Sequence, residues 1–440
     1  MGRLTRWLAA TVAACAIGPV GAGAAAGFDG FGDATADSTY DDEIRFEVKL
    51  EGSAPDRLEL LLSTPGGEGS FVTPVEPDRG SATYEWDTSV EYVTPNTPVT
   101  YRWRAHVDGD IVLSEAQTIR YEDDREALDW RSAQLGEATV HWYGDAEAQA
   151  RRFGELTAVG VERAEQLLGT SLAGPVDVFV YATRDDFAGA LGPGAREWIG
   201  AVAYTHLRTI FMWLEGGSPA YLEVAMVHEV THIVFHDATD NPYHEPARWL
   251  NEGIATWSEI GDAGGQRSIV EFEAAGGGLF SFEAITQQFP IGERAAELSY
   301  AQGTTMIDLI VDRYGPEAIA RITAAYREGS SDDEALELGT GIPADQLYAD
   351  FYAEFGVAAP QPISPEPIGP STVDRPVAGE VDPGGVDGAP GEPPPDAAPG
   401  EGSQPGDDGA VPLLIALAAG GAAAAVIAVR VSRRAARRAS

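Results

Sequence analysis

Hydrophobic and polar positions alternate along several short stretches between residues 28 and 122. Ile44–Leu50 is the clearest case, because Ile, Phe, Val and Leu fall on one face of an extended chain. Turn-forming residues separate the stretches, for example at Pro65–Gly67 and Asp108–Asp110. Strands at this spacing predict an antiparallel β-sandwich, immunoglobulin-like or fibronectin-like, over residues 28–122. The other strand-like stretches are Leu58–Leu62, Ala82–Asp87, Val99–Arg104, Ile111–Glu115 and Gln117–Tyr121.

The predicted sandwich carries no pattern that points to chemistry. Trp86, Tyr101 and Trp103 are its most distinctive side chains. Aromatic residues at alternating strand positions usually pack in a core, whereas a ligand-binding role is the alternative. We expect these three residues to lie in the core.

The pattern changes to mixed α/β near residue 128. A long helical stretch covers Ala146–Leu168, and beyond Ser218 the chain is mainly helical as far as Phe355. Residues 128–356 are therefore predicted to form a second domain. Its strand-like segments are Ala138–Trp142, Val176–Tyr181, Ile199–Tyr204 and Thr209–Leu214.

Both ends of the chain carry membrane-related signals. Residues 1–26 combine a basic start, an apolar stretch and small residues, which is typical of a cleaved secretory signal peptide. A bacterial lipobox that would lipidate Cys15 is the alternative. Residues 410–429 hold no charge and are long enough for one transmembrane helix, and the basic tail of residues 430–440 follows at once. This order predicts a single-pass cell-membrane protein with an extracellular N-terminal ectodomain and a cytoplasmic C-terminus.

Two further features of the sequence are a predicted linker and a strong excess of acidic residues. Residues 357–409 are rich in Pro, Gly, Asp and Glu, which predicts a disordered linker. The chain has 69 acidic against 29 basic residues, a net charge of −40, and Lys49 is its one lysine. No basic face is available to neutralise phosphates, so a nucleic-acid partner is excluded. The acidic excess indicates a solvated surface or, alternatively, one that attracts a basic substrate.

One predicted helix carries a metal-binding pattern. Ser218 and Pro219 are typical of a helix start, and the helix that follows is apolar on nearly all sides. It contains His228 and His232 in the order His-Glu-x-x-His. A step of four residues places both imidazoles on one face, and Glu229 is rotated away from them, so that it can reach a metal-bound water without ligating the ion. The alternative is a buried helix with satisfied core histidines.

A second segment decides between these readings. Trp249–Ala255 has the sequence Trp-Leu-Asn-Glu-Gly-Ile-Ala, and Glu252 lies twenty positions after His232. The interval is long enough for a helix end, a loop and the start of a second helix. Two histidines and one carboxylate leave the fourth position of a tetrahedral zinc ion open, which is the catalytic arrangement. The sequence therefore predicts one Zn²⁺ per chain.

These residues resemble the gluzincin clan of zinc peptidases, and among them the peptidase MA-like family fits best. The resemblance extends through Tyr300–Gln302, Asp312–Gly315 and Asp333–Ala335, and it covers roughly residues 138–356. It implies a gluzincin-type zinc peptidase domain, and together with the patterns described above this gives an α+β chain in which the β-sandwich precedes that domain and the disordered linker and one transmembrane helix follow it. Clan members often place a Tyr or His opposite the zinc, which makes Tyr300 a candidate catalytic donor, while packing against the core is the alternative.

Departures from the motifs of the clan narrow the expected activity and the expected set of zinc ligands. The chain lacks Gly-x-Met-Glu-Asn, with which M1 enzymes recognise a free amine, so aminopeptidase action is unsupported and an endopeptidase is expected. Thermolysin-like enzymes carry an Asp where this chain has Thr256, so a carboxylate behind the histidines must come from elsewhere or be absent. A metzincin would need a histidine where Ala238 stands. His236 and His244 are expected to be structural or exposed rather than ligands.

The resemblance and the residues together predict an extracellular, membrane-anchored zinc metallopeptidase. It would cleave a peptide or protein substrate by a zinc-activated water, with Glu229 as general base. Substrate could add as a strand along a sheet edge at Thr209–Leu214. One alternative is a catalytically silent gluzincin fold that acts as a binding or scaffolding protein, and another is hydrolysis of a cell-envelope amide that is not a protein. The oligomeric state is left open.

Overall fold

The computed structural model describes residues 27–67, 69–192, 200–259 and 264–360. The predicted signal peptide with Cys15, the transmembrane helix at 410–429 and the basic tail lie outside the described residues, as does the linker apart from residues 357–360. Among the described helices, none is both long and apolar enough to cross a membrane.

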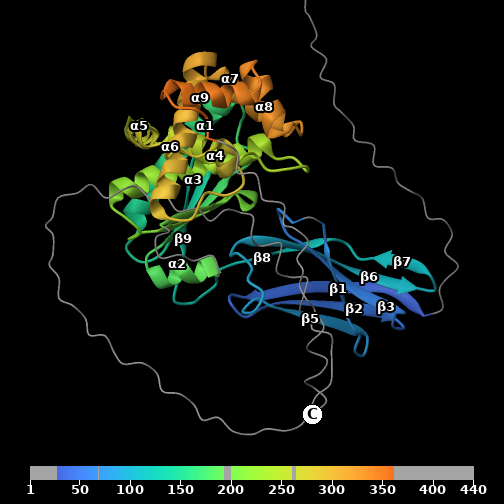
Figure 1. The fold of residues 1–440 in the computed structure, drawn as a ribbon. Helices are drawn as coiled ribbons and strands as arrows, with labels where there is room; N and C mark the ends of the chain where they lie inside the picture. Colours follow the sequence, from blue (N-terminus) through green and yellow to red (C-terminus); the bar gives the residue numbers. More distant parts are fainter. Residues whose placement is uncertain (1–26, 68, 193–199, 260–263, 361–440) are drawn as a thin grey trace, which may run out of the picture. The chain divides into compact units, whose positions relative to one another are not determined.

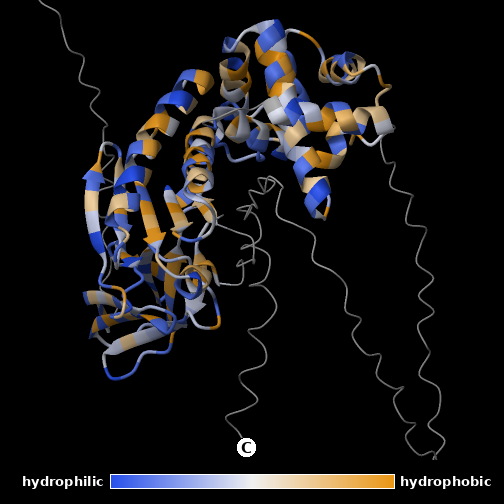
Figure 2. Ribbon diagram, turned by 90° about the vertical axis from the view of Figure 1, so that its left-hand side faces the viewer, coloured by the Kyte–Doolittle hydropathy of each residue, from blue (hydrophilic) through white to orange (hydrophobic). Residues whose placement is uncertain are grey.

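The chain divides into two compact units. One holds the described residues up to Val159 together with Ala173–Ser218, and the other holds Gly160–Leu172 and the described residues from Pro219 onward. Among the described elements, the first unit contains all of the strands and the second contains most of the helices. Blue and orange bands alternate along most of the ribbons in Figure 2, as expected for elements with one buried face.

The N-terminal strands form two antiparallel sheets. A three-stranded sheet has the order β1-β2-β5, and a larger sheet has the order β4-β3-β6-β7, with β8 pairing beside β7 along β6. All six strand-like stretches predicted here are strands, whereas β1 and β4 were not predicted. The strands are β1 (Phe28–Thr39), β2 (Glu43–Gly52), β3 (Arg57–Ser63), β4 (Phe71–Pro74), β5 (Ser81–Asp87), β6 (Thr97–Val107), β7 (Asp110–Leu113) and β8 (Gln117–Tyr121).

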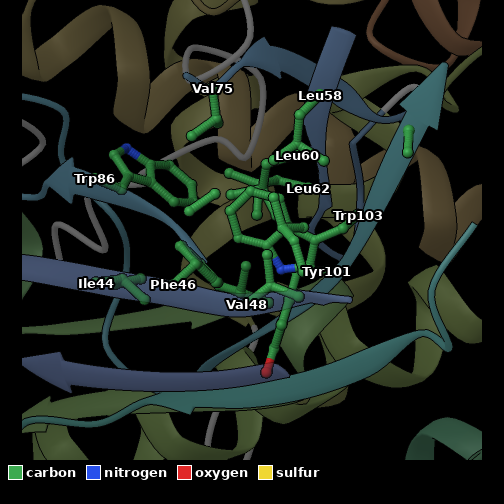
Figure 3. Close-up of a cluster of buried hydrophobic side chains, with 14 of the residues drawn as sticks. Ile44, Phe46, Val48, Leu58, Leu60, Leu62, Val75, Trp86, Tyr101 and Trp103 are labelled. Atoms are coloured by element: carbon green, nitrogen blue, oxygen red, sulfur yellow. The ribbon is translucent and has the colours of Figure 1, made fainter. Parts of the chain in front are cut away.

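Alternate residues of these strands fill one hydrophobic core (Figure 3). Along β6 every second residue is buried, from Thr97 to Val107, which is the period of a strand with one covered face. Trp86, Tyr101 and Trp103 are all buried in this core, as predicted from their alternating positions. They therefore serve packing, and the sandwich offers no aromatic ligand surface at these positions.

A second sheet in the same unit has the order β12-β13-β11-β10-β9. Its three inner strands β13, β11 and β10 run parallel, and the two outer strands pair antiparallel to them. The strands are β9 (Arg131–Leu135), β10 (Ala138–Trp142), β11 (Val176–Tyr181), β12 (Ala201–Tyr204) and β13 (Thr209–Trp213). The short elements α2 (Arg184–Leu191) and η2 (Thr205–Leu207) connect them.

The prediction that Thr209–Leu214 forms an edge strand was wrong. The strand β13 pairs with β11 on one side and with β12 on the other, so its backbone groups have no room for an added peptide. Its first four residues are buried, as expected of an inner strand covered on both faces. The edge on this side of the sheet is β12, Ala201–Tyr204.

Seven helices of the second unit, shown in Figure 1, follow in the order α3 to α9. The helix α4 contacts both α3 and α6, so these three pack side by side. Trp257 of α4 donates a hydrogen bond from Nε1 to Asp308 Oδ1 of α6, at 2.7 Å. The helices are α3 (Pro219–Thr239), α4 (Arg248–Ser258), α5 (Gly264–Gly276), α6 (Glu293–Tyr314), α7 (Glu317–Arg327), α8 (Asp332–Thr340) and α9 (Ala344–Glu354), with the short η3 (Phe282–Ile285) before α6.

The helix α1 (Glu147–Leu168) supplies its last residues to this unit. Gly160 lies against α3 so closely that a Cβ atom there would be 2.2 Å from Val230 Cγ1. Arg163, one turn further on, donates hydrogen bonds to the carbonyl oxygens of Ser258 and Glu259 at the end of α4, at 2.8 and 2.7 Å. The end of α1 therefore supports both α3 and the C-terminus of α4.

Candidate metal centre

The helix α3 positions two imidazoles on one buried face. It begins at Pro219, as predicted, and fourteen of its residues are buried, in keeping with its apolar sequence. His228 is fully buried and His232 is 5% exposed, and their rings meet edge to face at 4.7 Å between centroids. Glu229, the next residue after His228, is also 5% exposed. Such burial of three ionisable side chains requires partners.

The helix α4 brings a carboxylate to the same place. Glu252 is 1% exposed, and its Oε2 lies 3.6 Å from His228 Nε2 and 3.5 Å from His232 Nε2. All three atoms are buried and none has a hydrogen-bond partner among the described residues. His228, His232 and Glu252 are also the only cluster of potential metal ligands within the described part of the chain. The prediction that the helix pair brings these residues together is thus met by the geometry.

The three atoms fit a zinc ion. Two ligand atoms at 2.0–2.1 Å from a shared tetrahedral ion are about 3.4 Å apart, which is close to the observed separations. Buried polar atoms without partners are costly, and a shared cation satisfies all three of them at once. The donor set of two imidazole nitrogens and one carboxylate oxygen is one that catalytic zinc sites use.

Glu259 holds the outer nitrogen of His228. Its Oε1 lies 2.9 Å from His228 Nδ1, and Arg163 fixes the backbone at this point, as described above. This contact leaves Nε2 facing Glu252, because an imidazole with a carboxylate at one nitrogen offers the other nitrogen as a ligand. The carboxylate that an Asp supplies in thermolysin-like enzymes thus comes here from Glu259, while Thr256 is buried with its Oγ1 unpartnered among the described residues.

Asn251 holds the outer nitrogen of His232. Its Oδ1 lies 2.8 Å from His232 Nδ1, and it immediately precedes the carboxylate ligand candidate Glu252 in α4. Neither Asn251 nor Glu259 was predicted to belong to the site. Asn251 stands inside the motif that identified Glu252, and Glu259 follows Glu252 by seven residues, which is two turns along the same helix face. Both positions could have been found from that spacing.

The two imidazoles have opposite electrostatic surroundings. Burial lowers the pKa of His228, but the nearby carboxylates of Glu252 and Glu259 outweigh it and raise this pKa to about 10. Burial lowers the pKa of His232 to about 4, and the neighbouring charge of His228 acts in the same direction. The carboxylates beside His228 therefore favour a positive charge on this imidazole, whereas burial disfavours one on His232.

Tyr300 comes from the middle of α6 and lies beside the same imidazoles. Its ring centroid is 6.3 Å from that of His228, the side chain is 8% exposed, and its hydroxyl has no hydrogen-bond partner among the described residues. Burial raises the pKa of Tyr300 well above its ordinary value, and the charge of Glu252 adds to this effect. The hydroxyl is thus a neutral donor with a free proton next to the cluster.

His236 and His244 do not join the cluster. His236 is partly exposed one turn after His232, and His244 is partly exposed with its ring 5.9 Å from that of Tyr326. Neither belongs to the group of potential ligands within the described residues. This placement agrees with the expectation that both are structural.

A family model decides what kind of domain carries this geometry. Residues 157–354 match the model described as the Peptidase MA superfamily. This segment is a peptidase MA-like domain. The match includes His228, Glu229, His232, Glu252 and Tyr300, so the resemblance predicted from the two motifs is confirmed for this part of the chain.

This chain is also similar to several solved structures. They include zinc metallopeptidases whose sequences are only distantly related to it. An M1 zinc metallopeptidase from Deinococcus radiodurans is 15% identical with a TM-score of 0.33, over 74% of this chain and 92% of that chain. A variant of the Deinococcus radiodurans enzyme bound to a Tyr-Ser-Ala substrate is 14% identical with a TM-score of 0.33, over 78% and 97%. An aminopeptidase N family protein from Idiomarina loihiensis is 11% identical with a TM-score of 0.39, over 76% of both chains. No curated protein matches the chain significantly.

Proposed function

We propose that this chain is an extracellular, membrane-anchored zinc peptidase that hydrolyses internal peptide bonds. One observation carries the proposal: three unpartnered buried atoms, His228 Nε2, His232 Nε2 and Glu252 Oε2, converge within the peptidase MA-like domain. Zinc bound by them would act as a Lewis acid that polarises a carbonyl and lowers the pKa of bound water to about 7.

Two further side chains have the chemistry that hydrolysis needs. Glu229 follows His228 on α3, and as general base it accepts the proton of the attacking water and delivers it to the leaving amine. Tyr300 donates a hydrogen bond from its unpartnered hydroxyl to the oxyanion that develops on the substrate carbonyl. Its raised pKa supports this role, since a neutral phenol keeps the proton that the hydrogen bond requires.

Three residues outside the cluster fix the orientation of its imidazoles. Glu259 and Asn251 orient the two imidazoles through their Nδ1 atoms, and Arg163 anchors the end of the helix that carries Glu259. Such outer contacts fix the ring planes, so that the Nε2 atoms are aimed before an ion binds. A silent binding protein would not need the general base, and Glu229 is present.

Two sequence patterns support the proposed location of the enzyme. The pattern of residues 1–26 supports secretion, and the apolar stretch at 410–429 with the arginines behind it supports a single membrane anchor. The acidic Pro- and Gly-rich stretch between the peptidase domain and that anchor would act as a spacer. The substrate in this proposal is a peptide or protein outside the cell.

A digest of a broad peptide library by the purified, zinc-loaded protein tests the proposal. Cleavage that stops with a chelator and returns with added zinc would support it, and mass spectrometry of the products would separate internal from terminal cleavage. Zinc binding without cleavage of any peptide would instead favour a binding protein. Cleavage restricted to cell-envelope amides would favour a hydrolase whose substrate is not a protein.

A further inference from the structure

Arg248 stands at the edge of the metal centre. It is the first residue of α4, one turn before Glu252, and its backbone N–H donates to Thr286 O at 2.6 Å. Its Nε lies 3.9 Å from Glu252 Oε1, while the other oxygen of Glu252 faces the histidines. The guanidinium is therefore on the outer side of the same carboxylate that the cluster uses.

The Arg248 side chain is mostly buried, and its Nε lacks an acceptor in the described part of the chain. The side chain is 18% exposed, and its Nε is buried without a hydrogen-bond partner among the described residues. The group lies over the ring of Phe289, at 5.2 Å, and Phe289 in turn packs edge to face on Tyr300 at 5.3 Å. Aromatic packing thus fixes the guanidinium near Tyr300, while its Nε–H has no acceptor among the described residues.

Glu252 does not account for this arrangement. At 3.9 Å the contact with Oε1 is longer than a hydrogen bond, and it gains only Coulomb attraction. An arginine held in a partly dry site without an acceptor carries a desolvation cost, which a bound anion would remove. A planar guanidinium fits a carboxylate, because two parallel N–H groups can meet its two oxygens.

We propose that Arg248 binds a carboxylate of the substrate and so selects acidic substrates. The proposal rests on the proposed peptidase function, because it assigns a specificity residue to that site. One residue of an extended peptide spans about 3.5 Å, so the group that Arg248 reaches belongs to a residue close to the scissile bond. Two sources supply this chemistry: the side chain of Asp or Glu, which fits cleavage of internal bonds, and the α-carboxylate of a C-terminal residue, which would place cleavage at the chain end instead.

Binding to the zinc-loaded Glu229→Gln protein separates the two sources. Isothermal titration would compare acetyl-Ala-Ala, acetyl-Ala-Ala-amide and acetyl-Ala-Glu-amide. Tighter binding of the first alone indicates the α-carboxylate, and tighter binding of the last indicates an acidic side chain. We expect at least tenfold between the favoured carboxylate peptide and the neutral one. The added substitution Arg248→Gln should abolish that ratio, Arg248→Lys should keep part of it, and Arg294→Gln, which removes an exposed arginine of α6 paired with Glu273, should leave it unchanged.

Other results would overturn the proposal. Equal binding of the three peptides, binding of none at millimolar concentration, or a preference that survives Arg248→Gln would each exclude it, the last because the metal alone would then bind the carboxylate. A loss of zinc in Arg248→Gln, measured by elemental analysis, would also contradict it and would make Arg248 a residue that positions Glu252. Because the readout is binding, it stands apart from the peptidase proposal: a protein that cleaves nothing can still show the Arg248-dependent preference.

Discussion

Gly253 and Gly303 lie against each other where α4 crosses α6. A Cβ atom on Gly253 would be 2.6 Å from the carbonyl carbon of Gly303, and one on Gly303 would be 2.5 Å from Trp249 O. These distances are too short for any side chain, so the two backbones are in direct contact. Glu252 immediately precedes one of these glycines and Tyr300 lies one turn before the other. The crossing therefore sets the distance between the carboxylate of the cluster and the tyrosine.

Gly253→Ala should separate the two helices and disturb the metal centre. Overpacking of this kind typically costs about 1–3 kcal/mol of the free energy of unfolding, and a shift of α4 would move Glu252 away from the imidazoles. We expect a lower melting temperature and weaker zinc binding in the same variant. Gly276→Ala is the matched control, since a Cβ atom there meets nothing within 4 Å. An unchanged zinc affinity in Gly253→Ala would show that the crossing does not set the ligand geometry.

Glu259→Ala and Asn251→Ala should weaken zinc binding without removing a ligand. Each takes away the group that orients one imidazole through Nδ1, and loss of such contacts typically costs about 10–100-fold in metal affinity or activity. A competition titration with a chelating dye would measure the affinity. Glu271→Ala, on the exposed surface of α5, serves as the control for removing a carboxylate. Affinities equal to that of the control would mean that these contacts have no part in aiming the imidazoles.

His228→Ala and Glu252→Ala should each lose zinc. Both residues offer a buried atom to the shared site, and truncation of one would leave the other ligand atoms buried without their ion. The glutamate variant should be milder if water can take the place of the carboxylate. His236→Ala, one turn beyond His232 and outside the cluster, should retain about one zinc per chain. Elemental analysis of the purified variants decides, and zinc retained in full by His228→Ala would contradict the proposed ligand set.

Periodicity predicted the strands whose faces differ in polarity and missed those whose faces do not. Along β6 large apolar residues alternate with polar ones, and the strand was evident. The strand β1, Phe28–Thr39, consists mainly of Gly, Asp, Ala, Ser and Thr, and it is extended because it pairs with β2 over most of its length. That pairing is a tertiary interaction, which local sequence does not encode.

Local sequence also could not predict the order of the strands in the second sheet. Residues 209–213 were correctly expected to be extended, but alternation carries no information on neighbours. The run Thr-Ile-Phe-Met-Trp is apolar at consecutive positions, which is typical of an inner strand, and it could have corrected the assignment to an edge.

The ligand cluster could be predicted because helix geometry alone aligns its parts. His228 and His232 are one turn apart, and the motif around Glu252 required only that a second helix return beside the first. Arg163 could not be found in this way, since it reaches Glu259 from a position 96 residues earlier in the chain. Contacts of that kind depend on how α1 packs against α3 and α4.

Glu229→Gln tests the central claim most directly, because Glu229 is proposed to move protons and not to hold the ion. The variant should retain about one zinc per chain, and its turnover of a peptide that the wild type cleaves should fall by about 10²–10⁴-fold, the usual contribution of a general base. Zinc content by elemental analysis and cleavage by mass spectrometry would be measured on the same preparation. Turnover equal to that of the wild type at full zinc occupancy would contradict the account.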